Sequence, residues 1–280
     1  MKIFVCLIFF VLPFGFVNAQ DKSVNQTAKE EKAQQILEAA KNAVSKKTDV
    51  RKIISFAANT ITSNEIVVPE RNNLKLQQTI TSDFSIVFPN KIRRSLISKG
   101  TTNDSTEISI LNENRLSIKN DAFVNGEKVN FNFANALSKD EQISSLKDDA
   151  FRLFFPITLD SSWYSSLKFK YVGIAESKDG KAELVEAVAS NNVKYQLFFD
   201  INTHLLLLLK KSFAYTKDNQ TKEFEEKQFF SDYQEKSGLL VATKIIIEQN
   251  AGNSLYEETT IKDLKVNPTF KPDYFVVKEK

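Results

Sequence analysis

The feature that most limits the fold of this chain is an alternation of apolar and polar residues that recurs from residue 52 onward. Residues 193–197 read Val-Lys-Tyr-Gln-Leu, the pattern of a strand with one buried and one exposed face. Similar segments are separated by turn residues such as Asn125-Gly126, which tolerate positive φ. Many short strands joined by tight turns predict a large antiparallel sheet.

Several boundaries are specific enough to be tested. Residues 74–81, 84–88 and 129–133 are predicted as separate strands, and residues 274–277 as a closing strand. Residues 65–73 are predicted as a loop or a mobile flap. The five consecutive leucines at 205–209 are far too few to cross a membrane. They predict a strand that is buried on both faces, or one that faces a core and an apolar cavity.

Two segments have helical spacing instead. Thr27 and Glu30 form a capping box before an amphipathic stretch at 28–46, and a polar lead at 20–26 is expected to be disordered. Ser138 and Glu141 form a second capping box, and Pro156 is expected to end that helix. The fold class predicted from these patterns is α+β with an antiparallel sheet.

The N-terminus predicts export. Lys2 precedes an apolar stretch at 3–17, and Val17-Asn18-Ala19 is a small-residue cleavage site, so residues 1–19 are expected to be a signal peptide and 20–280 one domain. The single cysteine, Cys6, lies inside that signal, which leaves no thiol for a disulfide or a thiolate metal site. Lys and Arg total 38 against 35 Asp and Glu, which argues against a nucleic-acid partner.

No residue pattern predicts catalysis. His204 is the only histidine and follows a turn, no serine has the glycines of a nucleophile elbow, and seven glycines supply no phosphate loop. The carboxylate pairs at 148–149, 225–226 and 257–258 are expected to be solvated, as is the basic cluster of Lys91, Arg93 and Arg94. We therefore expect no catalytic residue, no metal site and no cofactor, and a hydrolase is the weakest of three hypotheses.

Apolar residues, among them many of the 23 phenylalanines, are the remaining candidates for function. Each of them taken singly is best explained as ordinary core. Taken together, they could line an apolar cavity inside a curled antiparallel sheet. The candidate lipid-binding residues are Phe84, Ile86, Phe88, Ile92, Phe151, Phe154, Phe155, Trp163, Leu197, Phe199, Leu206 and Leu208.

Short motifs resemble the outer-membrane lipoprotein-sorting (LolA-like) superfamily. Pro89-Asn90 followed by Arg93 is similar to a hairpin of that family, although Phe88 stands where its carriers often have an arginine. The C-terminal motifs are Phe230-Ser231-Asp232-Tyr233, Gly238-Leu239, Lys244-Ile245, Val266-Asn267-Pro268 and Phe275, with Ala242 in place of a proline. The resemblance implies a strongly curved antiparallel half-barrel of about 10–12 strands, covered by two or more helices and enclosing a hydrophobic cavity.

The resemblance also implies a function. The first hypothesis is an exported, non-enzymatic protein that binds a lipid or an acyl chain, such as that of a lipoprotein, for transport across the periplasm. Phe151, Phe154 and Phe155 would then form a lid and the strands a wall. Such a protein would be a monomer in the periplasm or secreted, with transient membrane contact. The alternative is an envelope interaction or sensing protein whose partner is another protein.

Overall fold

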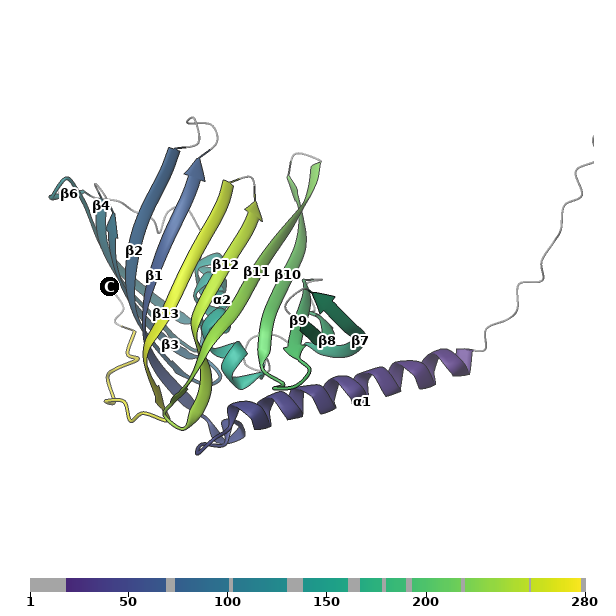
Figure 1. The fold of residues 1–280 in the computed structure, drawn as a ribbon. Coiled ribbons are helices and arrows are strands. Elements are labelled where there is room, and N and C mark those ends of the chain that lie inside the picture. The colour runs from purple at the N-terminus through teal and green to yellow at the C-terminus, as the bar shows by residue number, and fades with distance from the viewer. Residues whose placement is uncertain are drawn as a thin grey trace, which may run out of the picture.

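A computed structural model describes residues 19–68, 74–100, 103–129, 138–160, 167–177, 180–189, 193–217, 220–251 and 253–277. Within these residues the chain forms one antiparallel sheet of 13 strands and two α-helices. The sheet is strongly curved and open, with α2 in its concave side and α1 across one end (Figure 1). The predicted α+β class and curved half-barrel are confirmed, with slightly more strands than expected.

The strands form two meanders that meet at a central pair. The first contains β1 (Ser55–Val68), β2 (Leu74–Val87), β3 (Lys91–Gly100), β4 (Asn103–Asn112), β5 (Arg115–Val124) and β6 (Glu127–Val129). The second contains β7 (Lys168–Ser177), β8 (Gly180–Val188), β9 (Lys194–Asp200), β10 (Leu206–Lys217), β11 (Gln220–Lys236), β12 (Leu239–Ala251) and β13 (Asn253–Val266). Because β1 pairs with β13, the order is β6-β5-β4-β3-β2-β1-β13-β12-β11-β10-β9-β8-β7.

This order places β6 and β7 at opposite edges, although they follow one another among the strands of the chain. The connection between them must therefore cross the whole sheet, and it contains α2 (Lys139–Thr158). Ser138 caps this helix as predicted, since its side chain accepts from Glu141 N at 3.3 Å and its own N–H donates to Glu141 Oε2 at 2.7 Å. The second half of α2 is buried, including Phe151, Phe154 and Phe155.

Aromatic contacts fix α2 against the concave face. Phe154 stacks on Phe56 of β1 with ring centroids 5.0 Å apart and meets Phe84 of β2 edge-on at 5.7 Å. Phe151 stacks on Phe155 at 4.5 Å and lies 5.7 Å from Tyr195 of β9. One helix thus contacts strands from both meanders, and these contacts form the centre of the core.

The first helix, α1 (Ala19–Val44), lies across one end of the sheet (Figure 1). It buries Ala33, Ile36, Leu37, Ala40 and Val44, the apolar face that the sequence predicts. The helix begins before the predicted capping box, so the expected disordered lead at 20–26 is wrong for the described residues 20–26, which are helical. Gln26 donates to Glu30 one turn later (3.1 Å), a contact within a continuing helix.

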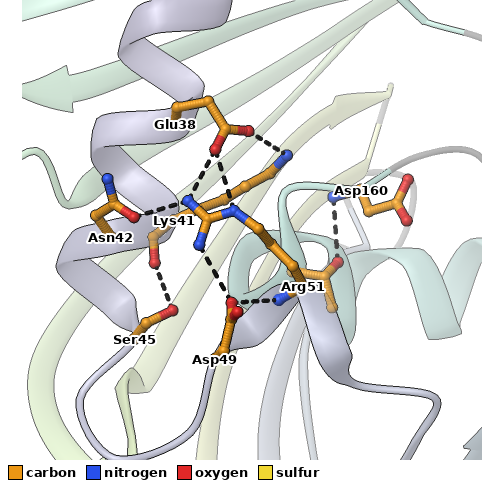
Figure 2. A network of polar contacts seen from close by, with 8 residues as sticks. Glu38, Lys41, Asn42, Ser45, Asp49, Arg51 and Asp160 are labelled. Atoms are coloured by element: carbon orange, nitrogen blue, oxygen red, sulfur yellow. Dashed lines mark hydrogen bonds and ion pairs between the residues drawn. The ribbon is translucent and has the colours of Figure 1, made fainter.

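A polar network joins the end of α1 to the short 3-10 helix η1 (Val50–Lys52) (Figure 2). Arg51 Nη2 donates to Glu38 Oε2 at 2.8 Å and to Asn42 Oδ1 at 2.7 Å. Its Nη1 donates to Asp49 Oδ1 at 3.1 Å. The hydrogen bonds from Arg51 and Lys41 hold the pKa of the Glu38 carboxyl below its usual value.

Three predicted boundaries are corrected. β1 continues to Val68, through the first part of the expected loop at 65–73, because residues 55–68 pair with β2 throughout. The segments 74–81 and 84–88 belong to the single strand β2, because Ser82 and Asp83 pair with β1 and β3 like their neighbours. The predicted strand at 129–133 ends at Val129 in β6, and its remainder lies outside the described residues.

The predicted end of the second helix is also wrong, since α2 continues past Pro156 to Thr158. A proline removes one hydrogen bond to the preceding turn, but its φ is compatible with a helix. Other donors form hydrogen bonds to the backbone carbonyls of the last turn. Thr158 Oγ1 donates to Phe154 O at 3.1 Å, and Leu159 N donates to Phe155 O at 2.7 Å.

The expected closing strand at 274–277 is absent, and the segment is a turn. Ring contacts hold this segment in place of strand pairing. The ring centroids of Phe270 and Tyr274 lie 4.9 Å apart, and the Arg93 guanidinium lies 4.8 Å from the centroid of the Tyr274 ring. The preceding Asn267 has a different structural role. Its Oδ1 accepts from Ile54 N at 2.8 Å and Ser55 N at 3.3 Å, which anchors the C-terminal segment to the start of β1.

The leucine run is not buried on both faces. Leu206 and Leu209 are buried, whereas Leu207 is 39% exposed. The register between β9 and β10 shifts between Leu206 and Leu208, which is a bulge that turns Leu207 outward. The run therefore contributes two residues to the core without forming a two-sided apolar strand.

The turn between β11 and β12 requires a glycine. Gly238 has φ +78°, and an added Cβ would lie 2.6 Å from Thr48 Oγ1. Its carbonyl accepts from the N–H groups of Lys46, Lys47 and Thr48 at 3.2, 2.9 and 3.1 Å. This turn thereby holds the chain that follows α1.

We expect Gly238→Ala to lower the free energy of unfolding by about 2–3 kcal/mol, because it combines a left-handed backbone with a collision against Thr48. Gly126→Ala is the matched control, because Gly126 has φ +84° but no atom within 4 Å of the added Cβ. That control should cost only about 1 kcal/mol. Urea unfolding measures both, and equal losses would contradict the proposed collision.

Candidate binding site

The candidate site is a cavity of about 200 Å³ between α2 and the concave face of the sheet. Its walls come from α2 and from five strands of both meanders, β1, β2, β3, β12 and β13. The lining residues are Thr60, Thr62, Ile80, Ser82, Phe84, Arg94, Leu96, Asp149, Arg152, Leu153, Ile245, Ile247, Glu257 and Thr259. The cavity thus depends on the β1–β13 pairing that joins the meanders.

One part of the cavity wall is apolar. Ile80 and Leu96 lie on neighbouring strands of the first meander, and Ile245 and Ile247 lie two residues apart on β12. Leu153 faces them from α2. Residues two apart on a strand share a face, so the alternation produces two aliphatic patches. The register places Thr62 of β1 and Thr259 of β13 between Ile80 and Ile245, so a threonine pair separates the patches.

The rest of the wall carries charged groups linked by ion pairs. Arg94 on β3 pairs with Asp149 on α2, and its Nη2 lies 2.6 Å from Glu107 Oε1 on β4. Arg152 on α2 lies 3.7 Å from Asp149 Oδ1 through Nη1 and 2.5 Å from Glu226 Oε2 through Nη2. The single carboxylate of Asp149 therefore lies between two guanidinium groups.

Glu226 on β11 is the most fully hydrogen-bonded of these carboxylates. Besides Arg152, it accepts from Gln228 Nε2 at 2.7 Å and from Gln249 Nε2 at 2.6 Å. Burial raises the pKa of the Glu226 carboxyl, but Arg152 and the two amides lower it more, so that it lies below its ordinary value. Glu226 is therefore ionised near neutral pH.

Glu257 on β13 has fewer hydrogen-bonding partners than Glu226, and its pKa moves in the opposite direction. It accepts one long hydrogen bond, from Thr259 Oγ1 at 3.4 Å, and within the described ranges it forms no ion pair. Burial raises the pKa of the Glu257 carboxyl, and the nearby Arg152 charge offsets this only in part. Its ionised form is thus disfavoured in the folded protein.

Two arginine side chains that line this cavity each carry a buried donor without a partner. Among the residues that the structure describes, Arg94 Nε and Arg152 Nε are buried and have no hydrogen-bond acceptor. Gln228 Oε1 on β11 is a buried acceptor that has no hydrogen-bond donor among the described residues. Unsatisfied buried polar atoms are rare in folded proteins, and two of the five found in the described residues belong to side chains that line this cavity.

Most of the sequence-predicted candidates that the structure describes lie in the core on the concave side. Phe84 lines the cavity, whereas Ile86, Ile92, Leu197 and Phe199 have no exposed surface. Phe151, Phe154, Phe155 and Leu206 are buried as well, Leu208 is half-buried, and Trp163 lies outside the described residues. Phe88 lines a second cavity at the end of α1. A ligand contact for these residues stays a prediction.

The sequence analysis missed the charged half of the site. Arg94, Asp149, Glu226 and Glu257 were each expected to be solvated. That expectation is wrong, because these side chains lie between α2 and the concave face of the sheet. The argument that adjacent strand residues face opposite sides still holds. Glu225 pairs with Lys210 and Glu258 with Lys244 on the other face. One member of each pair is therefore solvated and the other is buried.

The second cavity, of about 390 Å³, lies where α1, η1 and the end of α2 meet, beside Lys41, Arg51 and Asp160 (Figure 2). Its cations are already paired. Lys41 lies 3.0 Å from Glu38, and Arg51 pairs with both Glu38 and Asp49. These contacts tie structural elements together, so we place the candidate site in the first cavity.

Neither a metal cluster nor a spanning helix is found in the described part of the chain. No group of three or more His, Cys, Asp or Glu residues there could hold a metal ion. No helix there is long and apolar enough to cross a membrane.

Substituting Glu257 tests whether burial of its carboxyl group destabilises the folded protein at neutral pH. Because its folded pKa is raised, the folded state binds more protons than the unfolded state between the two pKa values, and stability falls as pH rises through that window. Glu257→Gln removes the charge and should raise Tm near pH 7 by about 2 °C. The gain should vanish near the ordinary glutamate pKa of about 4.3.

The control for this experiment is Glu258→Gln, which changes the neighbouring carboxylate on the opposite face. Glu258 is paired with Lys244 at 3.0 Å and is 37% exposed, so its substitution should leave Tm nearly unchanged. Thermal unfolding followed by circular dichroism across this pH range measures both variants. A Glu257→Gln protein that is less stable than wild type near pH 7 would contradict the argument.

Comparison with known proteins gives a similarity of fold. No family model matches the sequence, and no curated protein matches it. A structure described as an outer membrane lipoprotein-sorting protein domain from Vibrio parahaemolyticus is 8% identical. The match covers 88% of this chain and 97% of that chain, with a TM-score of 0.46. A DUF1329 family protein from Desulfovibrio piger is 10% identical. The match covers 87% of this chain and 97% of that chain, with a TM-score of 0.49.

A LolA superfamily protein from Nitrosomonas europaea is 12% identical. The match covers 88% of this chain and 97% of that chain, with a TM-score of 0.43. Two of these three names are those of the superfamily that the sequence motifs resemble. At these identities and scores the likeness concerns the fold alone.

Proposed function

We propose that this protein is an exported, non-enzymatic carrier that binds a lipid or an acyl chain in the cavity between α2 and the concave face. The observation that carries the proposal is the aliphatic wall of Ile80, Leu96, Ile245 and Ile247, which Leu153 faces from the helix. An acyl chain placed there would be removed from water. Each Å² of apolar surface buried in this way contributes about 25 cal/mol to binding.

The surroundings of the cavity support the same function. Phe84 borders the cavity and contacts Phe154, which is fully buried between α2 and the sheet. A chain longer than the cavity would have to displace Phe154 and Phe151, and it would then contact the other apolar residues predicted from the sequence. The buried aromatic cluster thus acts as the closed end of the site.

The predicted signal peptide at residues 1–19 supports a location in the periplasm or outside the cell. A cargo of acyl chains would come from a lipid or from an acylated protein, with transient contact to a membrane. We expect the carrier to act as a monomer.

Native mass spectrometry with lipid extraction tests this function on protein purified from its own host. A stoichiometric lipid or acylated peptide would establish the carrier and its cargo class. Protein that is empty, and that also takes up no added acyl probe, would overturn the carrier function. The alternative of an envelope protein that binds a protein partner would then be favoured.

A bulky residue placed in the wall should block binding. Leu96→Trp points a larger side chain into the cavity, and we expect the affinity for a pyrene-labelled monoacylglycerol to fall by about tenfold or more. The matched control is Ile97→Trp, because Ile97 is the next residue of β3 and is 47% exposed. Fluorescence titration measures both, and equal affinities for the two variants would refute this location of the site.

A further inference from the structure

A groove of about 620 Å³ lies over the central strands of the sheet, near the ends of β1 and β2 that point away from α1 (Figure 1). Ser63 of β1 and Thr79 of β2 line this groove. Their neighbours Thr62 and Ile80 line the cavity on the α2 side. Since successive strand residues face opposite sides, the groove lies on the convex face, and the sheet itself separates it from the proposed acyl-binding cavity.

Differences in side-chain length form the groove. In the strand register, Ser63 pairs with Glu258 of β13 on one side and with Thr79 on the other. Thr79 in turn pairs with Lys99 of β3. The two short side chains form the floor, and the longer ones form walls on either side. Tyr256 lies two residues from Glu258 on the same face of β13 and extends that wall.

A second hollow, of about 300 Å³, follows along the same strands toward α1. Ala57 and Asn59 of β1 belong to its lining, and Ile61 lies between the two hollows on this face of the strand. From Ala57 to Glu65 in the first hollow, the strand covers about 26 Å at about 3.3 Å per residue. An elongated ligand that follows the strands therefore fits this surface better than a compact one.

The polar groups of the first hollow are open to a ligand. Four lining residues have exposed side chains that form no hydrogen bond or ion pair within the described ranges, namely Ser63, Gln77, Thr79 and Lys99. Tyr256 is 42% exposed, and no other ring of the described residues stacks on it. The hollow thus offers hydroxyl, amide and ammonium groups beside an accessible aromatic ring.

The same lining is unsuited to an acyl chain or a peptide. Among the residues that the structure describes, no aliphatic side chain lines the first hollow, so apolar groups would gain little there. The strands β1 and β2 are each paired on both sides. No free strand edge is therefore available at this place to which an extended peptide could add.

The charges of the hollow do not favour an ionic ligand either. Glu258 already pairs with Lys244 at 3.0 Å. The other two charged residues of the lining, Lys99 and Glu65, have opposite signs. With one charge balanced against the other, neither an anion nor a cation gains a net electrostatic attraction.

We infer that this groove binds a neutral, elongated oligosaccharide on the convex face, independently of the acyl-binding cavity. A sugar ring has an apolar face, which packs on an aromatic ring such as that of Tyr256. The hydroxyl groups around the sugar donate and accept hydrogen bonds, and Ser63, Gln77 and Thr79 supply both donors and acceptors for them. The paired strands hold these groups in place, which reduces the entropy lost on binding.

Isothermal titration calorimetry with the wild-type protein tests the class of ligand. The probes are three neutral linear hexasaccharides, cellohexaose, chitohexaose and maltohexaose. We expect at least one of them to bind with a Kd below about 1 mM, and its affinity to change less than about twofold between about 50 and 500 mM NaCl. Failure of all three to bind, or an affinity that falls steeply with salt, would overturn the inference.

Substitutions locate the site. Ser63→Trp fills the floor of the groove, and we expect it to lower the affinity for the bound hexasaccharide by about tenfold or more. The matched control is Ser231→Trp, because Ser231 is an exposed serine of β11 outside the groove. Tyr256→Ala should cause a similar loss, whereas Phe229→Ala, which removes a 36% exposed ring from β11, should not. Equal affinities for the two tryptophan variants would contradict this location.

Two further titrations keep this inference distinct from the proposed carrier function. The pyrene-labelled monoacylglycerol should bind Ser63→Trp as it binds wild type, because the two sites lie on opposite faces of the sheet. If a hexasaccharide binds and the monoacylglycerol does not, the carrier function fails and the saccharide site stands. If an uncharged hexapeptide of Ser, Gln and Gly binds at Ser63 and no saccharide does, the groove is a peptide site and the inference is wrong.

Discussion

The packing of α2 on the concave face is the interaction on which the rest of the structure depends. Because β6 and β7 occupy opposite edges of the sheet, the connection between them must cross it, and α2 makes that crossing. Phe154 contacts Phe56 and Phe84, while Phe151 reaches Tyr195 in the other meander. Burial of these rings joins the two meanders and leaves a cavity where the aromatic contacts end.

The same helix brings charge beside the apolar wall. Asp149 and Arg152 lie within two turns of the buried phenylalanines of α2, and they form ion pairs with Arg94 and Glu226 of the sheet. Buried ion pairs of this kind contribute little net stability, because desolvation offsets their attraction. Their effect here is geometric, because they fix the orientation of α2 relative to β3 and β11.

Much of the fold could be predicted from local patterns, whereas the charged half of the site could not. The period-two strands, the Asn125-Gly126 turn and the Ser138 cap need only neighbouring residues, and the structure contains all three. The alternation at 225–226 and 257–258 also indicates that each pair is split between two faces. It does not show which face is covered, because the covering helix is distant in sequence, and so Glu226 and Glu257 were taken as solvated.

By itself, the sequence determined the α+β class of the fold, its antiparallel strands and its tight turns, because these follow from side-chain periodicity and turn chemistry. Only the tertiary structure decided that β1 pairs with β13, that α2 lies across the concave face, and that Arg94 and Arg152 meet at Asp149. These outcomes depend on contacts between residues far apart in the chain. Local preferences are the same whether or not such contacts form, which is why the site emerges only when the meanders are joined.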